Sequence, residues 1–127
     1  MITGIHIIAY AAQAEKTCAF FRDVLGLSSV DAGDGWLIFA LPPAEFAAHP
    51  TEEGDDAPPD GQPRCELYLM CDDLPRTMAE LKGKGVRFTM PVSEQPWGSL
   101  TMFALPGAGQ MGLYQPKHPV AIKPAGK

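Results

Sequence analysis

Apolar, β-branched residues predominate along residues 2–10, and this pattern predicts a β-strand near the N-terminus. One face of that strand would carry Ile5 and Ile7, and the other would carry His6 and Tyr10. The residues that follow change to a helical spacing. Apolar side chains then recur every three or four positions, at Ala14, Cys18, Phe21 and Leu25. Gly26 comes directly after them and suits the left-handed end of a helix.

Short apolar runs separated by turn residues predict the rest of the first half. Strands are expected over residues 36–41, over residues 27–31 with a weaker pattern, and over residues 45–49. Pro42 and Pro43 stop the strand before them, because proline donates no hydrogen bond to a sheet. The first half therefore has the predicted order β-α-β-β-β.

The second half repeats this order. Residues 65–71 predict a strand in which Leu67 and Leu69 oppose the face that carries Glu66, Tyr68 and Met70. Asp73 is a suitable N-cap for a helix whose apolar stripe is Leu74, Met78 and Leu81. Gly83 or Gly85 would end that helix. Three further strands are expected over residues 86–90, 99–105 and 111–115.

Two short motifs occur once in each half. Thr17-Cys18-Ala19 returns as Thr77-Met78-Ala79, sixty positions later, and Phe39-Ala40-Leu41-Pro42 returns as Phe103-Ala104-Leu105-Pro106. A duplicated module predicts a pseudo-twofold axis, so that corresponding positions of the two copies face each other.

An acidic segment separates the two copies. Residues 51–63 contain five acids and no basic residue, together with several prolines and glycines, which predicts an exposed linker. The predicted organisation is one domain over residues 1–127, with module 1 at 1–50, the linker at 51–63, module 2 at 64–116 and a tail at 117–127.

Composition and charge exclude several functional classes. The five acids of the linker account for the net charge of −5. The sequence has no basic stretch with interleaved aromatic residues, so we do not expect nucleic acid as a partner. No apolar run approaches the roughly 18 residues that span a membrane. The N-terminus has no secretory pattern, and three cysteines form no disulfide framework. We therefore expect a cytoplasmic protein with reduced thiols.

Several motifs together resemble the vicinal oxygen chelate superfamily. They are His-Ile-Ile-Ala-Tyr at 6–10, Phe-Phe-Arg-Asp-Val-Leu-Gly-Leu at 20–27, Leu-Met-Cys-Asp-Asp-Leu at 69–74, Pro-Trp-Gly at 96–98 and Gly-Leu-Tyr-Gln-Pro at 112–116. This superfamily includes glyoxalase I, extradiol dioxygenases and the bleomycin- and fosfomycin-resistance proteins. The resemblance implies an α+β fold with two tandem βαβββ modules forming a curled mixed sheet around a cleft. It also implies a homodimer.

The resemblance also implies where metal ligands would stand. Family members that bind Fe, Mn, Ni or Zn place a His or Glu on the first and last strands of each module. His6 fits the first position, and Glu66 corresponds to it sixty residues later. The other two positions hold Ala47 and Gly112, which have no coordinating side chain. A shifted site of His6, His49 and Glu66 is the alternative, and a charged pair between His6 and Glu66 is another.

The aromatic residues suggest a different use of the cleft. Apolar clefts with a few polar groups commonly bind small molecules, and Trp97 lies in a turn from which it can cover such a cleft. The predicted ligand-binding residues are His6, Tyr10, Trp36, Glu66, Tyr68, Trp97, Gln110 and Tyr114. The sequence favours a metal-free protein that binds a small molecule, such as a planar aromatic or antibiotic-like compound. A metal-dependent lyase, transferase or dioxygenase, and a metal-free enzyme in which Glu66 acts as acid or base, remain the alternatives.

Overall fold

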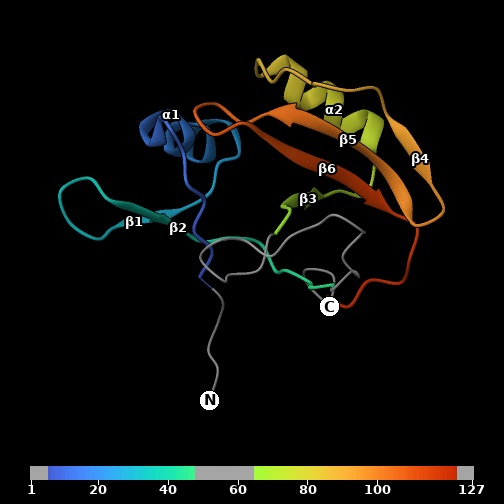
Figure 1. Ribbon diagram of the computed structural model, residues 1–127, viewed down its shortest axis with the longest axis horizontal. Helices are drawn as coiled ribbons and strands as arrows, with labels where there is room; N and C mark the ends of the chain where they lie inside the picture. Colours follow the sequence, from blue (N-terminus) through green and yellow to red (C-terminus); the bar gives the residue numbers. More distant parts are fainter. Residues whose placement is uncertain (1–5, 48–64, 123–127) are drawn as a thin grey trace, which may run out of the picture.

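The structure is a computed structural model that describes residues 6–47 and 65–122, and its elements confirm the α+β class (Figure 1). The first half contributes one helical segment and a hairpin, and the second half contributes one helix and four strands. The elements are α1 (Ala14–Ala19), η1 (Phe20–Val24), β1 (Ser29–Asp31), β2 (Leu37–Phe39), β3 (Tyr68–Met70), α2 (Leu74–Gly83), β4 (Ser93–Gln95), β5 (Gly98–Ala104) and β6 (Gln110–Pro116).

The main sheet is mixed and has the strand order β3-β6-β5-β4. Strand β6 pairs in parallel with β3, and it pairs with β5 in an antiparallel hairpin that runs from Gly98 opposite Pro116 to Ala104 opposite Gln110. The strands β1 and β2 form a separate antiparallel pair that extends away from this sheet (Figure 1).

Helix α2 covers one face of the sheet, as its sequence predicts. The Asp73 side chain accepts a hydrogen bond from the Arg76 amide at 3.1 Å, and Gly85, with a φ of 89°, follows the helix in the left-handed region. Leu74 and Leu81 are buried in the core, and Met78 packs against it. The same core contains Phe103, Leu105, Met111 and Leu113 from the sheet and the turn between β5 and β6.

The first helical segment docks on the second half of the chain. The rings of Phe20 and Phe103 lie 5.8 Å apart, and the Thr17 hydroxyl donates a 2.6 Å hydrogen bond to the Pro106 carbonyl. The predicted stripe of this segment is confirmed in part: Phe21 and Leu25 pack against the core, whereas Ala14 is exposed. Thr17 and Phe20, which the stripe did not include, are buried. The chain changes from α- to π-helical hydrogen bonding at Phe20.

Several predicted strands differ from the structure. Residues 6–10 and 45–47 form no strand, and residues 86–90 form only a single bridge, between Phe88 and Phe103. The backbone N–H and C=O groups of a strand need hydrogen-bond partners on a neighbouring strand. The side-chain pattern of residues 6–10 does not provide such a strand. Strand β4 was not predicted, because Ser93, Glu94 and Gln95 have no apolar face. The linker at 51–63 and His49 lie outside the described residues.

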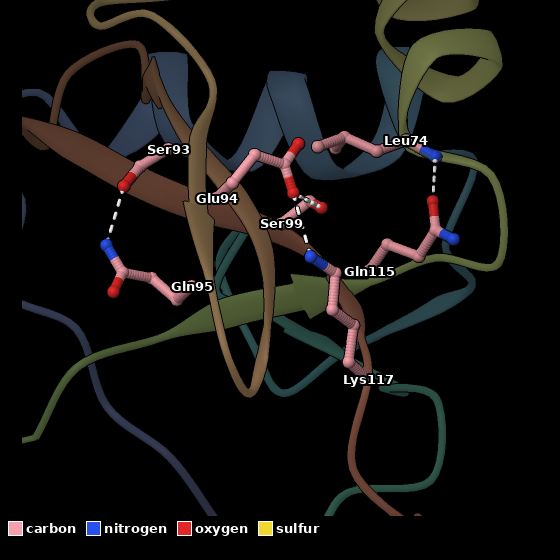
Figure 2. A network of polar contacts seen from close by, with 7 residues as sticks. All are labelled: Leu74, Ser93, Glu94, Gln95, Ser99, Gln115 and Lys117. Atoms are coloured by element: carbon pink, nitrogen blue, oxygen red, sulfur yellow. Dashed lines mark hydrogen bonds and ion pairs between the residues drawn. The ribbon is translucent and has the colours of Figure 1, made fainter.

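Polar side chains hold strand β4 and the start of α2 in place (Figure 2). Glu94 accepts hydrogen bonds from the Ser99 hydroxyl and, at 2.9 Å, from the Lys117 ammonium group, and these bonds lower the pKa of the Glu94 carboxyl group. The Gln115 side chain accepts the Leu74 amide hydrogen bond at 2.8 Å. Strand β4 has no apolar face, so these polar contacts, and not apolar packing, account for its position.

No helix within the described ranges is long and apolar enough to cross a membrane.

Candidate functional site: an aromatic cluster on the sheet

The face of the sheet opposite α2 carries a group of rings, which we call the aromatic cluster: Tyr68, Trp97, Tyr114 and His118. Tyr68 and Tyr114 lie on neighbouring strands, at positions that alternate with the core residues Leu69 and Leu113. Trp97 lies in the turn between β4 and β5, and its amide carbonyl accepts a 2.8 Å hydrogen bond from the Lys117 amide. Residues distant in the sequence therefore converge on one surface.

Tyr114 is at the centre of the aromatic cluster. Its ring centroid lies 5.7 Å from that of Tyr68 at 86° and 6.0 Å from that of Trp97 at 70°, and both are edge-to-face contacts. The His118 ring lies 6.1 Å from it. Trp97 remains 44% exposed, so this indole presents a wide apolar surface to solvent. Edge-to-face packing fixes the rings and leaves that surface available for another flat molecule.

Two carboxylates flank the cluster. The Tyr68 hydroxyl donates a hydrogen bond to a Glu66 oxygen at 3.2 Å, and a Glu45 oxygen lies 3.9 Å from His118 Nε2. The other Glu45 oxygen accepts the Ala121 amide at 2.7 Å. Burial, followed by the nearby Glu66 charge, raises the pKa of Tyr68. Burial, followed by the nearby Glu45 charge, raises the pKa of Tyr114, so both phenols stay protonated and able to donate at neutral pH.

The hydrogen bonds of His118 determine its tautomer. Nδ1 lies 2.8 Å from the Pro119 carbonyl oxygen, and a carbonyl only accepts, so Nδ1 carries the proton. In the neutral ring Nε2 is then an acceptor, and it lies 3.3 Å from the Tyr114 hydroxyl oxygen. Tyr114 therefore donates to His118, which fixes the orientation of the central phenol.

Gly112 explains why the Tyr68 ring lies flat across the sheet. The two residues are direct partners in the parallel pairing of β3 and β6. A Cβ atom at position 112 would lie 2.0 Å from Tyr68 Cδ1 and 2.3 Å from Cε1, which no structure tolerates without movement. The ring of Tyr68 thus fills the space that a side chain at position 112 would need. This is the position at which the family resemblance implies a metal-binding carboxylate.

The structure brings together four of the predicted site residues and separates the others. Glu66, Tyr68, Trp97 and Tyr114 are joined by the contacts described above. The rest are His6, Tyr10, Trp36 and Gln110. Tyr10 is 90% exposed and Trp36 is 74% exposed beside the β1–β2 hairpin, and no described ring contact joins either to the aromatic cluster. Gln110 accepts a hydrogen bond from the Thr89 hydroxyl at the opposite end of β6.

Glu45 and His118 also contact the aromatic cluster or each other, although the sequence offers little reason to choose them. His118 follows the last strand, in a segment expected to be a loosely held tail. Glu45 lies on a segment expected to be a strand, and its contact with His118 spans more than seventy residues. The four-residue spacing between Tyr114 and His118 is a weak signal, because it brings two side chains together only if the chain turns after β6.

The described residues do not assemble a site for a divalent metal ion. Within residues 6–47 and 65–122, no group of three His, Cys, Asp or Glu side chains converges as metal ligands. His6 is exposed, and no ion pair or hydrogen bond of the described region joins it to Glu66, whose partner is Tyr68. The predicted pair of His6 and Glu66 is therefore not formed here.

The sequence profile of the Glyoxalase/Bleomycin resistance protein/Dioxygenase superfamily matches residues 5–115. The chain belongs to this superfamily. The match spans both modules and confirms the resemblance inferred from the motifs. No curated protein matches the chain.

Solved structures of the superfamily share the fold. TnmS3, an antibiotic binding protein from Streptomyces sp. CB03234, is 25% identical, with 91% of this chain and 98% of that chain covered and a TM-score of 0.59. A superfamily member from Sphaerobacter thermophilus DSM 20745 is 22% identical, with 90% and 98% covered and a TM-score of 0.58. A lactoylglutathione lyase from Agrobacterium tumefaciens is 14% identical, with 90% and 94% covered and a TM-score of 0.59.

Proposed function

We propose that the aromatic cluster binds a small, flat, aromatic molecule without the help of a metal ion. The observation that carries this proposal is the convergence of Tyr68, Trp97 and Tyr114 on the sheet face that α2 leaves uncovered. Rings held edge-to-face in this way add little reorganisation cost to the stacking of a ligand. The likeness to an antibiotic binding protein supports a small-molecule ligand.

The polar groups around the rings would orient such a ligand. Glu66 and Glu45 offer carboxylate oxygens at two edges of the cluster, and the phenol of Tyr68 is protonated and can rotate toward a ligand acceptor. A few polar groups around an apolar surface are the usual arrangement in small-molecule sites. The superfamily also contains enzymes, and a metal-dependent lyase, transferase or dioxygenase built around His6 and Glu66 is the alternative function.

Stacking on Trp97 is tested with two dyes of opposite charge. Proflavine is cationic and anthraquinone-2-sulfonate is anionic, and we expect both to stack and to quench Trp97 fluorescence in a Trp36→Phe background. Proflavine should bind more tightly, because two carboxylates flank the cluster. Trp97→Ala should weaken both dyes by about tenfold, the usual effect of removing an aromatic anchor.

Trp36→Ala is the matched control for this experiment, because it removes the other exposed tryptophan, which has none of the described ring contacts of the cluster. Its affinities, measured by calorimetry, should match those of the native protein. Equal losses in the two variants, or no binding of either dye, would contradict the proposed function.

Metal content distinguishes the proposed function from the alternative. Elemental analysis of tag-free protein purified without chelators should find no stoichiometric Fe, Mn, Ni or Zn, because Gly112 supplies no ligand and the Tyr68 ring occupies the space in front of it. His6→Ala and Glu66→Ala should leave that result unchanged. Stoichiometric metal in the native protein that is lost in either variant would establish the metal-dependent alternative.

A further inference from the structure

A groove at the other end of the β5–β6 hairpin carries two positive charges. Its volume is about 500 Å³, and its walls are residues 12, 13 and 16 at the start of α1, residues 104–109 between β5 and β6, and Arg87. We call it the basic groove. Tyr114 lies five positions after Gly109 along β6, which is roughly 17 Å along a strand. The basic groove is therefore separate from the aromatic cluster and does not depend on its proposed function.

The walls of the basic groove are held together tightly. The Gln13 amide donates a 3.0 Å hydrogen bond to the Gly107 carbonyl, and Thr17 is bonded to Pro106 beside it. Gly107 has a φ of 80°, and a Cβ atom there would lie 2.2 Å from the Gln13 carbonyl oxygen. Only glycine allows this approach. The groove is thus a fixed frame built by the contact between α1 and the β5–β6 turn.

The two positively charged side chains of the basic groove have no hydrogen-bond, ion-pair or ring partner among the described residues. Among the lysines and arginines of residues 6–47 and 65–122, five have a polar or ring partner: Arg22 with Asp23, Arg76 with Glu80, Lys82 with the Phe88 ring, Lys84 with the Val24 carbonyl and Lys117 with Glu94. The two that have none in these ranges are Lys16 and Arg87, and both line the basic groove. No carboxylate lines it.

We propose that the basic groove binds the phosphate group of a small molecule. Two unpaired cations lining one groove match the charge of a phosphate dianion, and a guanidinium group can bond two of its oxygens at once while an ammonium group contacts a third. In a chain with 15 acids and 10 basic residues, the convergence of unpaired cations costs electrostatic energy that a bound anion relieves. The amide side chain of Gln13 adds a neutral donor at the same wall.

Amide chemical shifts at constant ionic strength test the proposal. Inorganic phosphate, phenyl phosphate and acetate are titrated into ¹⁵N-labelled protein at pH 7.5. We expect saturable shifts at the amides of Gln13, Gly107 and Gly109 with both phosphates, and an affinity for acetate at least about tenfold lower, because a monoanion meets only one of the two charges. Tighter binding of phenyl phosphate identifies a phosphate ester as the ligand, and tighter binding of inorganic phosphate identifies the free ion.

Three variants distinguish phosphate binding in the basic groove from a general effect of the protein's charge. Lys16→Gln and Arg87→Gln should each weaken phosphate by about tenfold or more, as expected for loss of a charge-assisted hydrogen bond. Lys84→Gln removes the same charge from an ammonium group bonded to Val24, and should change the affinity less than about twofold. Both groove residues are exposed, so the remaining amide shifts should stay in place. Equal weakening by Lys84→Gln, equal binding of acetate, or no saturation overturns the proposal.

Discussion

Replacing Phe103 by alanine is expected to lower the free energy of unfolding by about 3–5 kcal/mol, the usual cost of truncating a buried phenylalanine. The side chain has no exposed surface. Its ring lies 5.8 Å from that of Phe20 and 6.2 Å from that of Phe88, so the substitution leaves a cavity between three segments. Urea denaturation followed by circular dichroism measures the effect. A loss below about 1 kcal/mol would contradict this account of the core.

Phe46→Ala is the matched control, because this phenylalanine is 85% exposed and its removal should change stability by less than about 0.5 kcal/mol.

A double-mutant cycle of Phe20→Ala and Phe103→Ala then measures how strongly the two halves of the chain are coupled. The two rings are in contact, so we expect a coupling free energy of about 0.5–3 kcal/mol. A coupling of zero would indicate that the helical segment formed by α1 and η1 does not dock on the sheet in solution.

The sequence predicted α2, β5 and β6 in the second half of the fold well, because the local signals of these elements agree with their packing. Asp73 and Gly85 bound a helix whose stripe meets the core, and alternation along β6 separates Met111 and Leu113 from Tyr114. The first half was predicted less well. Its residues 6–10 have no partner strand, and pairing between strands is a property of the tertiary structure that the side-chain pattern does not encode.

The sequence predicted part of the site and misplaced the rest. Alternation on β3 and β6 indicated that Tyr68 and Tyr114 lie on one face, as the register of the two strands shows. The duplication paired His6 with Glu66, a pairing that requires two equivalent first strands, and the first copy forms none over residues 6–10. The contacts of Glu45 and His118 arise from the path of the chain after β6, which no local pattern of the sequence specifies.

Gly112→Ala is expected to destabilise the protein by about 1–3 kcal/mol, the usual cost of overpacking. The added methyl group would lie 2.0–2.8 Å from three carbons of the Tyr68 ring, so the ring must leave its place above β6. That movement also removes the edge-to-face contact between Tyr68 and Tyr114 and the hydrogen bond to Glu66. We therefore expect a loss of dye affinity together with the loss of stability.

The double variant Tyr68→Ala/Gly112→Ala separates a steric clash from a loss of strand geometry. If the clash with the ring is the cause, Gly112→Ala should cost less than about 0.5 kcal/mol once the ring is absent, as measured by urea denaturation against Tyr68→Ala alone. An equal cost in both backgrounds would mean that position 112 needs glycine for its backbone instead. Gly112→Glu in the Tyr68→Ala background then gives a carboxylate the space that the ring occupied. If elemental analysis finds metal in that variant alone, then two features together prevent metal binding at this position of the sheet. They are the Tyr68 ring and the absence of a side chain at position 112.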